Sequence, residues 1–499
     1  MQYISTRGRA EQMTSAGAIV KGIAEDGGLF VPESIPYLDK MAWEALLRYS
    51  YQEQAAYLLS LFLSDFSFEE IQQCVKGAYS NEHFDHSEIA PLVALNDEIS
   101  ILELWHGPTA AFKDMALQIL PHFLQISAQK IGETKEIVIL VATSGDTGKA
   151  ALEGFKDVAG TQIVVFFPEE GVSAVQKQQM VTQSGNNVWV ASIDGNFDDA
   201  QNAVKMIFDN NQIAADLQSE NQMLSSANSI NWGRLVPQIV YYITACANMK
   251  KQGKLKDGET INVVVPTGNF GNILAAYYAK CMGAPIHKLI CASNENHILT
   301  DFIRTGIYDR RRAFYKTLSP SMDILISSNL ERLLFELTEH DSLLVQQWMY
   351  ALKEDGMYAV DACTHEKVIA NFWAGFTSDH DTLSVIEGVW RQYGYLMDTH
   401  TAVGYNVYQR YLKSTGDHRK TILASTASPF KFTASAAEAI MPETKDKFDE
   451  FALLKELSAF TGQPIPSGLK DLEQKPILFK EILNKEKIAV ALLEHLKIK

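Results

Sequence analysis

Four short apolar runs, each followed by a loop that holds glycine or proline and then by a helical pattern, constrain the fold of this chain most strongly. The runs span residues 136–142, 161–167, 187–193 and 260–265, and they are rich in Val and Ile without polar alternation. Such continuous runs are typical of parallel strands that are buried on both faces. Helical patterns follow at residues 149–158, 173–183 and 198–209 and in the segment that ends at Met282. The alternation predicts an α/β fold with open, doubly wound, mostly parallel sheets.

Two loops of this pattern are candidates for ligand binding, because ligands of such sheets sit at the carboxyl ends of the strands. The first loop contains Thr143, Ser144, Gly145, Asp146 and Thr147. Its hydroxyls and carboxylate suit recognition of a hydroxyl, an amine or a carboxylate. The second loop consists of Gly268, Asn269, Phe270, Gly271 and Asn272. Its backbone N–H groups and the start of the next helix suit a phosphate, and a plain tight turn is the alternative interpretation.

A lysine follows a fifth apolar run, from Ile99 to Trp105. Gly107 and Pro108 end that run, and Thr109 is expected to cap a helix that starts near Phe112. Lys113 then lies on the first helical turn, where the helix dipole disfavours the protonated amine and so favours Schiff-base chemistry. A solvated surface lysine is the ordinary alternative.

Neither glycine loop matches a nucleotide-binding motif. The pattern GxxxxGK[ST] fails, because Thr143 stands five residues before Gly148 and Ala150 follows Lys149. The dinucleotide pattern GxGxxG is absent from both loops. A lysine at a strand end together with a separate phosphate loop suits pyridoxal phosphate, which needs an amine for its aldehyde and a nest for its phosphate.

Several motifs of the chain resemble those of one enzyme family in their order and spacing. They are residues 3–8 (YISTRG), 26–32 (DGGLFVP), 106–114 (HGPTAAFKD), 143–148 (TSGDTG), 228–232 (NSINW), 268–272 (GNFGN) and 425–427 (STA). The chain resembles the threonine synthases of the bacterial and fungal type, which are pyridoxal-phosphate enzymes of fold type II, the tryptophan-synthase-β-like group. The last seventy or so residues lie outside these motifs.

The resemblance implies roles for individual residues. Lys113 would bind the aldehyde of pyridoxal 5′-phosphate, and residues 268–272 would hold its phosphate. Thr426, or alternatively Ser425, would face the pyridine nitrogen, and residues 144–147 would receive the carboxylate of the substrate. Asp146 departs from the wider fold group, which often has Asn there, so the partner of the 3-hydroxyl is left open. Candidates by residue type for a second anion site are Asn231, Arg234, Lys149 and Ser229.

The implied enzyme is a carbon–oxygen lyase acting on phosphates. It would convert O-phospho-L-homoserine and water to L-threonine and phosphate, with Lys113 moving protons at Cα and Cβ. A phospho-lyase or dehydratase on the same scaffold, which would release a 2-keto acid, is one alternative. A catalytically silent binding paralogue is another. His106 is expected either beside the cofactor ring or in the core, bonded to the backbone.

Composition narrows the partners of the protein. A net charge of −16 argues against binding to nucleic acid or to an anionic membrane. The N-terminus lacks an apolar signal segment, and no later stretch approaches the roughly 18 apolar residues of a membrane span. Five scattered cysteines predict neither a disulfide framework nor a metal site, and His83 and His86 are expected in a solvated loop. We expect a cytoplasmic protein that acts on a small molecule, as a monomer or a homodimer.

Three domains are expected along the chain. Residues 1–90 predict a mostly helical N-terminal domain, with helical periodicity at 41–63 and 68–79. Residues 91–440 predict the cofactor-binding core in two α/β lobes, in which Arg310 to Arg312 would form a solvated or salt-bridged loop. Residues 441–499 predict a helical extension packed on the surface.

Overall fold

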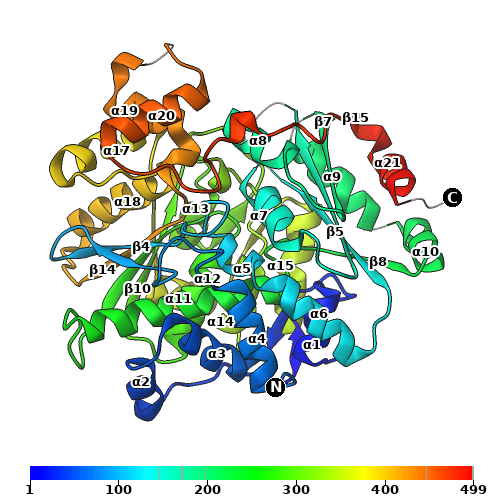
Figure 1. Cartoon of the computed structure of the whole chain (residues 1–499). Helices are drawn as coiled ribbons and strands as arrows, with labels where there is room; N and C mark the ends of the chain where they lie inside the picture. The colour runs from blue at the N-terminus through cyan, green and yellow to red at the C-terminus, as the bar shows by residue number, and fades with distance from the viewer. Residues whose placement is uncertain (144, 170–171, 196, 209, 445–446, 497–499) are drawn as a thin grey trace.

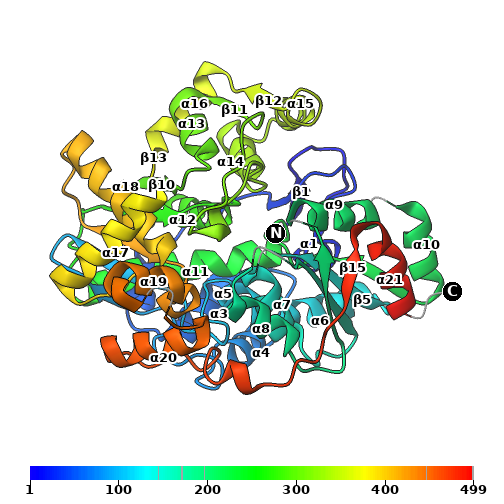
Figure 2. The ribbon, with the colours of Figure 1, turned by 90° about the horizontal axis from the view of Figure 1, so that it is seen from above.

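The computed structural model describes residues 1–143, 145–169, 172–195, 197–208, 210–444 and 447–496 (Figure 1). Two large sheets of mostly parallel strands lie beside one another in it. Viewed from above, the five-stranded sheet that contains β5 and β15 lies on the right, and the six-stranded sheet that contains β10 and β13 lies on the left (Figure 2). This arrangement confirms the predicted two-lobed α/β fold.

The N-terminal segment is mostly helical, as predicted. Strands β1 (Tyr3–Ser5) and β2 (Phe30–Pro32) pair antiparallel, and the helices are α1 (Ser15–Lys21), α2 (Lys40–Leu46), α3 (Tyr51–Phe62) and α4 (Phe68–Ala78). The periodicity expected at 41–63 is divided between two helices. Ser50 interrupts it, because its hydroxyl accepts the N–H of Glu53 while the Glu53 carboxylate accepts the N–H of Ser50, which makes a capping box that starts α3.

The six-stranded sheet has the order β13-β10-β9-β14-β4-β3, and only the β3–β4 pair is antiparallel. The strands are β3 (Leu92–Ala94), β4 (Ile99–Glu103), β9 (Ile261–Pro266), β10 (Ile286–Ser293), β13 (Phe372–Phe376) and β14 (Thr421–Ser425). In β9, Val263 and Val265 pack in one core with α11 (Trp232–Lys251) and α12 (Gly271–Cys281), whereas Val264 packs in another core with α18 (Thr399–Thr415). Helices therefore cover both faces of the sheet.

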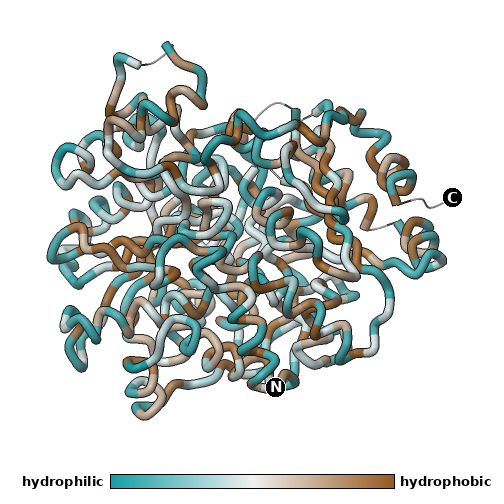
Figure 3. The backbone as a smooth tube through the Cα atoms, viewed as in Figure 1, coloured by the Kyte–Doolittle hydropathy of each residue, from teal (hydrophilic) through white to brown (hydrophobic). Residues whose placement is uncertain are grey.

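The five-stranded sheet has the order β15-β7-β6-β5-β8, and every pair is parallel. The strands are β5 (Glu136–Ala142), β6 (Thr161–Pro168), β7 (Val188–Asp194), β8 (Gln222–Ser225) and β15 (Ile482–Asn484). The helices around it are α6 (Leu120–Ile131), α7 (Asp146–Phe155), α8 (Ala174–Val181), α9 (Phe197–Phe208) and α10 (Asn211–Ser219). Figure 3 shows hydrophobic residues concentrated along these strands, which accounts for their strong signal in the sequence.

The segment from 298 to 393 gives the weakest signal in the sequence and is nevertheless ordered into short elements. They are α13 (Ile298–Thr305), β11 (Ile307–Asp309), η1 (Pro320–Met322), α14 (Leu330–Leu337), α15 (Ser342–Glu354), β12 (Met357–Ala359), α16 (Ala362–Asn371) and α17 (Asp379–Tyr393). The salt-bridged loop predicted for the arginine cluster is confirmed, since Arg311 pairs with Asp309 and Arg312 with Asp301.

The C-terminal extension is largely helical, as predicted, but it also contributes a strand that the sequence did not indicate. Besides η3 (Pro442–Thr444), α20 (Glu450–Thr461), η4 (Leu472–Gln474), η5 (Lys485–Lys487) and α21 (Ile488–His495), the tail contributes β15, which pairs in parallel with β7 (Figure 1). Leu457 and Leu472 belong to a core of the six-stranded lobe, whereas Leu483 and Leu492 belong to the outer core of the five-stranded lobe. The tail thus connects the two lobes. None of the described helices combines the length and the apolar content needed to cross a membrane.

Candidate active site

Four loops at the carboxyl ends of strands meet between the two lobes. Three of them follow β9, β14 and β4, which are neighbours in the six-stranded sheet, and the fourth follows β5 of the other sheet. The loop after β9 contains the phosphate-loop candidate, and the loop after β14 contains Thr426. The loop after β4 contains Lys113, and the loop after β5 contains Asp146. Parallel strands bring these segments to one edge although they are far apart in the chain.

The loop before Lys113 is shaped by Asp114, and the prediction that Thr109 caps the helix is wrong. Lys113 immediately precedes the short helix α5 (Asp114–Leu117), which has no side-chain cap. The buried carboxylate of Asp114 instead accepts the Thr109 N–H at 2.8 Å and the Thr109 hydroxyl at 2.7 Å. Gly107 is required there, because a Cβ at this position would lie 2.5 Å from the Cβ of Asp114.

The Lys113 amine is nearly buried and has only distant partners. Its side chain is 11% exposed, and Nζ lies 3.4 Å from Ser321 Oγ and 3.7 Å from Asp146 Oδ2. Burial lowers the pKa of Lys113 to about 8, against the attraction of Asp146 and with help from the Lys431 and Arg234 cations. Burial, rather than the dipole of the short helix α5, is therefore the main cause that lowers the pKa of this amine.

Asp146 is the charged centre of the opposite loop. Its Oδ1 accepts hydrogen bonds from Lys431 Nζ at 2.7 Å and from Gln176 Nε2 at 2.9 Å, and its Oδ2 accepts one from Ser321 Oγ at 3.2 Å. Burial alone would raise the pKa of Asp146, but the two lysines hold it well below its usual range. The carboxylate is therefore ionised at neutral pH.

The other residues of that loop mainly shape it. Thr143 Oγ1 accepts the N–H groups of Gly145 at 3.0 Å and of Gly148 at 2.9 Å, which folds the turn onto the start of α7. Gly145 has φ +136°, a conformation that side chains rarely adopt. Thr147 is half-buried, and the predicted site residue Ser144 lies outside the described residues.

The loop from Gly268 to Asn272 has the features of an anion nest. Phe270 has φ +64°, and α12 begins at Gly271 without a side-chain cap. The carbonyls of the loop are held from behind, because Ser327 Oγ donates to Gly268 O at 2.8 Å and Asn329 Nδ2 donates to Asn269 O at 3.0 Å. This pairing leaves the N–H side of the loop for a ligand.

Asn272 at the start of α12 supports the same interpretation. Its Oδ1 accepts the hydroxyls of Tyr241 at 2.7 Å and Tyr242 at 2.6 Å. Its Nδ2 is buried and has no partner among the described residues. A buried donor without a partner costs about 1–3 kcal/mol, which an anion would recover.

The loop after β14 distinguishes between Ser425 and Thr426. The Ser425 hydroxyl accepts hydrogen bonds from Trp105 Nε1 at 3.1 Å and from Thr401 Oγ1 at 3.0 Å. Thr426 is almost buried, and no bond of its hydroxyl is found in the described part of the chain. Of these two residues, only Thr426 has a hydroxyl without a partner among the described residues.

The predicted residues of α11 differ in their availability. Asn231 caps the helix, since its Oδ1 accepts the Gly233 N–H at 2.9 Å. Its Nδ2 donates to Ile19 O, also at 2.9 Å. The side-chain amide of Asn231 is therefore already bonded and is not presented to a ligand. Arg234 is buried, donates to Ala227 O, and pairs with no carboxylate of the described residues, while its Nε lacks a partner. Burial lowers the pKa of Arg234 to about 10, so it remains a cation that lacks a counter-ion.

The sequence analysis missed three residues that complete the cluster, namely Ser321, Lys431 and Gln176. Ser321 lies in η1, and its carbonyl oxygen lies 2.5 Å from where a Cβ of Gly268 would stand, so this one residue touches both the amine and the nest. Local sequence around Ser321 and Gln176 holds no distinguishing signal. Lys431 stands six residues after Ser425, between two phenylalanines, and an isolated charge in an apolar segment could have indicated it.

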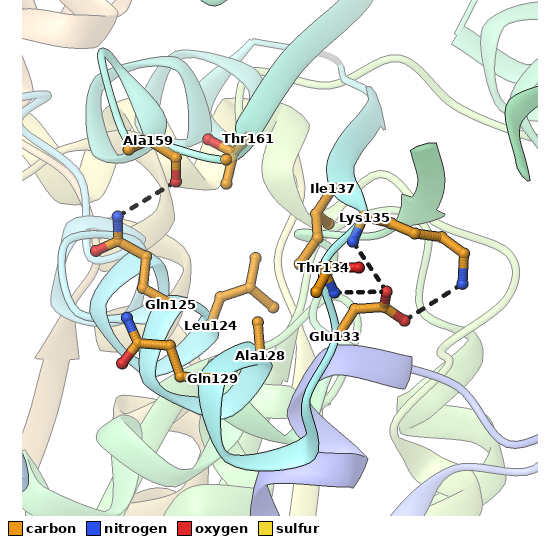
Figure 4. Close-up of a pocket in the computed structure, with 11 residues that line it drawn as sticks. Leu124, Gln125, Ala128, Gln129, Glu133, Thr134, Lys135, Ile137, Ala159 and Thr161 are labelled. Atoms are coloured by element: carbon orange, nitrogen blue, oxygen red, sulfur yellow. Dashed lines mark hydrogen bonds and ion pairs between the residues drawn. The ribbon is translucent and has the colours of Figure 1, made fainter. Parts of the chain in front are cut away.

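A separate surface hollow of about 300 Å³ lies away from this cluster (Figure 4). Residues of α6, such as Leu124 and Gln125, line it. The remaining lining residues, such as Lys135 and Thr161, lie at or just before the beginning of β5 and β6. It therefore opens at the amino ends of the strands, opposite the edge where Lys113 lies. The chemistry of the site is not located in this hollow.

Comparisons with known proteins give family matches over most of the chain. "Threonine synthase N terminus" matches residues 2–79, "Pyridoxal-phosphate dependent enzyme" matches residues 88–426, and "Threonine synthase, C-terminal" matches residues 401–491. A solved structure of PLP-bound threonine synthase from Brucella melitensis superposes with a TM-score of 0.87 at 36% identity and covers 99% of both chains.

Two curated relatives differ in their length. Threonine synthase of Schizosaccharomyces pombe is 35% identical over 519 residues, which cover 98% of this chain and 99% of the relative. Threonine synthase-like 1 of Homo sapiens is 42% identical over 456 residues, which cover 88% of this chain. The chain spans only 60% of the length of this second relative.

Proposed function

Because the chain belongs to the threonine synthase family of pyridoxal-phosphate-dependent enzymes, we propose that it converts O-phospho-L-homoserine and water to L-threonine and phosphate. One observation carries the proposal. The buried amine of Lys113 and the nest at Gly268 both contact Ser321, so a single small cofactor can reach both. An amine and a phosphate nest at this separation are what pyridoxal phosphate requires.

The described residues fit this cofactor. The uncapped start of α12 and the unpartnered Nδ2 of Asn272 would hold its phosphate, and the free hydroxyl of Thr426 would face its pyridine nitrogen. Lys113 would bind its aldehyde. When bound, the cofactor supplies an aldehyde that bonds to amines and a ring that delocalises the electrons of a Cα anion.

Lys113 is also the base and acid of the proposed reaction. Once the substrate amine has replaced it, the free Nζ takes the proton from Cα of the substrate and exchanges protons at Cβ. A pKa of about 8 suits both directions of transfer near neutral pH. The proton taken from Cβ is delivered to Cγ, which phosphate leaves, so that Cγ becomes the methyl group of threonine; water then adds at Cβ, and a proton returns to Cα.

Anion recognition divides the substrate between two sets of groups. The half-buried Thr147 would receive the carboxylate together with Ser144, because the Gly145 N–H is already bonded to Thr143 and the charge of Asp146 is already paired. Arg234, a buried cation without a carboxylate partner in the described chain, would attract the leaving phosphate. Asn231 keeps the role of helix cap in this proposal.

The setting of the enzyme is part of the proposal. All five cysteines lie in the described residues and are unpaired, which supports a reducing compartment such as the cytoplasm. We propose that the chain works there as a monomer or a homodimer, in three parts that span residues 1–90, 91–440 and 441–499. Light scattering of the purified protein measures its oligomeric state.

Product analysis tests the function. Purified protein with pyridoxal phosphate and O-phospho-L-homoserine should release threonine and phosphate in equal amounts. A 2-keto acid instead of threonine would identify a dehydratase or phospho-lyase, and no product at all would indicate a silent paralogue.

A matched pair of lysine variants tests the role of Lys113. Lys113→Ala should lose the visible absorption of the bound cofactor and at least about 10³-fold in kcat, since it removes both the covalent link and the base. Lys455→Ala, which removes an exposed lysine of the tail, should behave as the wild type. Equal activity of the two variants would exclude Lys113 as the reacting amine.

A further inference from the structure

Lys431 is a buried lysine that the proposed reaction does not use. It lies in η2 (Pro429–Phe432), the turn after β14, and its side chain is 0% exposed. Its Nζ donates to Asp146 Oδ1 at 2.7 Å and to Thr109 O at 3.0 Å. Lys431 thus joins the loops after β14, β5 and β4 at one point, next to Lys113.

Two lysines compete for the carboxylate of Asp146. A hydrogen bond between an ammonium and a carboxylate is normally about 2.7–2.9 Å long. Lys431 lies within this range at 2.7 Å, whereas Lys113 lies outside it at 3.7 Å. Gln176 and Ser321 occupy further positions around the carboxylate, so Asp146 is already well bound without Lys113.

Without Lys431, the same carboxylate would bind Lys113. Asp146 is ionised and 4% exposed, and a buried anion that loses its cation takes the nearest remaining one. The nearest remaining cation is Lys113, whose Nζ lies 3.7 Å from Asp146 Oδ2. Arg234 of α11, the other cation that acts on Lys113, forms no ion pair with Asp146. An ammonium that is paired with a carboxylate holds its proton and does not attack an aldehyde.

We propose that Lys431 is a positioning residue that occupies Asp146 and so keeps the amine of Lys113 unpaired and ready to react. The proposal rests on the proposed function only in taking Lys113 as the reacting amine. The balance of charges around Lys113 supports it. Burial is the main cause that lowers the pKa of this lysine, Asp146 opposes the shift, and Lys431 and Arg234 favour it.

The reactivity of the amine itself tests this role. The full-length chain, freed of cofactor, is labelled with trinitrobenzenesulfonate, which attacks only neutral amines, and the modification of Lys113 is followed by peptide mass spectrometry from pH 6 to pH 10. In the wild type, labelling of Lys113 should be half-maximal near pH 8. In Lys431→Met the midpoint should rise by at least one pH unit, which means about tenfold slower labelling at pH 7.

A second background separates the route through Asp146 from direct repulsion between the two lysines. In Asp146→Asn, the carboxylate that Lys431 is proposed to occupy is absent, so adding Lys431→Met should move the midpoint much less than it does in the wild type. Equal shifts in the two backgrounds would overturn the proposal. So would an unchanged midpoint in a Lys431→Met variant that melts as the wild type does.

Two further controls keep the test decisive. If Lys431→Met does not fold, Lys431→Gln replaces it, because glutamine retains a donor for Asp146 but carries no charge. The expected rise of the labelling midpoint is the same, and an unchanged midpoint would again overturn the proposal. Neither cofactor nor O-phospho-L-homoserine takes part in the labelling. A chain that makes no threonine but shows the expected shifts contradicts the proposed function alone, and an active enzyme without the shifts contradicts the role of Lys431 alone.

Discussion

Substitution of Gly468 by alanine should disturb the lysine loop from the far end of the chain. Gly468 lies in the tail between α20 and η4, and Gln179 Nε2 of α8 donates to its carbonyl at 3.2 Å. A Cβ at this position would lie 1.9 Å from Pro108 O and 3.0 Å from Pro108 C. The φ angle of Gly468 is not positive, so the effect of the added methyl group is purely steric.

The size of the effect follows from this distance. An ordinary carbon–oxygen contact is about 3.4 Å, so the two backbones must separate by about 1.5 Å. Overpacking of this kind costs about 1–3 kcal/mol, and we expect about 3 kcal/mol because both contacting atoms belong to the backbone. The Pro108 carbonyl is followed by Thr109, which both Asp114 and Lys431 hold, and Lys113 comes four residues later. A displacement of about 1 Å at a reacting group can cost about 10²-fold in rate.

Urea unfolding and initial rates of threonine formation measure the two effects. Gly388→Ala in α17 is the matched control, because its Cβ would meet nothing within 4 Å and alanine should stabilise the helix by up to about 1 kcal/mol. We expect Gly468→Ala to unfold at lower urea and to lose about 10²-fold in kcat/KM. If it matched the wild type in both assays, the contact between the tail and the lysine loop, and the reasoning built on it, would be refuted.

Two further predictions concern His106 and Asn329. His106 Nδ1 lies 2.6 Å from Asp85 Oδ1 and its Nε2 lies 2.9 Å from Glu103 Oε2, so both ring nitrogens face carboxylates rather than the backbone. Burial acts to lower the pKa of His106, but these carboxylates raise it to about 9. The stabilisation by these ion pairs is therefore complete below the unfolded pKa of about 6.5 and is lost as the pH rises through 9. His106→Gln should lower the free energy of unfolding in urea by about 2 kcal/mol at pH 6 and by much less at pH 10. An equal loss at both pH values would contradict this prediction. Asn329→Ala removes the hydrogen bond to Asn269 O behind the nest. It should raise the Kd for pyridoxal phosphate about tenfold, measured by an absorbance titration. An unchanged Kd would show that the nest does not depend on this support.

Local sequence was sufficient where one short pattern decides the structure. The strand predicted at residues 136–142 is β5 (Glu136–Ala142), because a run of buried Val and Ile has few other stable conformations. The helix after it was predicted to start at Lys149 but starts at Asp146, since Thr143 folds the turn more tightly than glycine content suggests. The cap expected from Thr109 failed because the helix starts only at Asp114, with Lys113 in the capping position, and the Thr109 hydroxyl instead donates to the Asp114 carboxylate.

The residues of the site divide in the same way. Lys113 and the nest at 268–272 could be proposed from the sequence, since each follows an apolar strand and has a chemistry that its neighbours reveal, whereas Thr426 was proposed from the family resemblance with Ser425 as an alternative. Asn231 was proposed by type alone, and the structure uses it as a helix cap. Ser321 and Lys431 could not be found in this way, because their significance lies in what they touch.

The sequence by itself determined the α/β fold with mostly parallel sheets, the edge of the sheets at which the candidate site lies, and the amine and nest that suit pyridoxal phosphate. These features depend on burial periodicity and on turn chemistry, which act over a few neighbouring residues. Only the tertiary structure decided that Asp146 pairs with Lys431 rather than with Lys113, and that the tail adds β15 to the sheet and lies against Pro108. The order of the strands brings these distant loops together, and which charges then meet depends on distances of a few ångströms that no local pattern encodes.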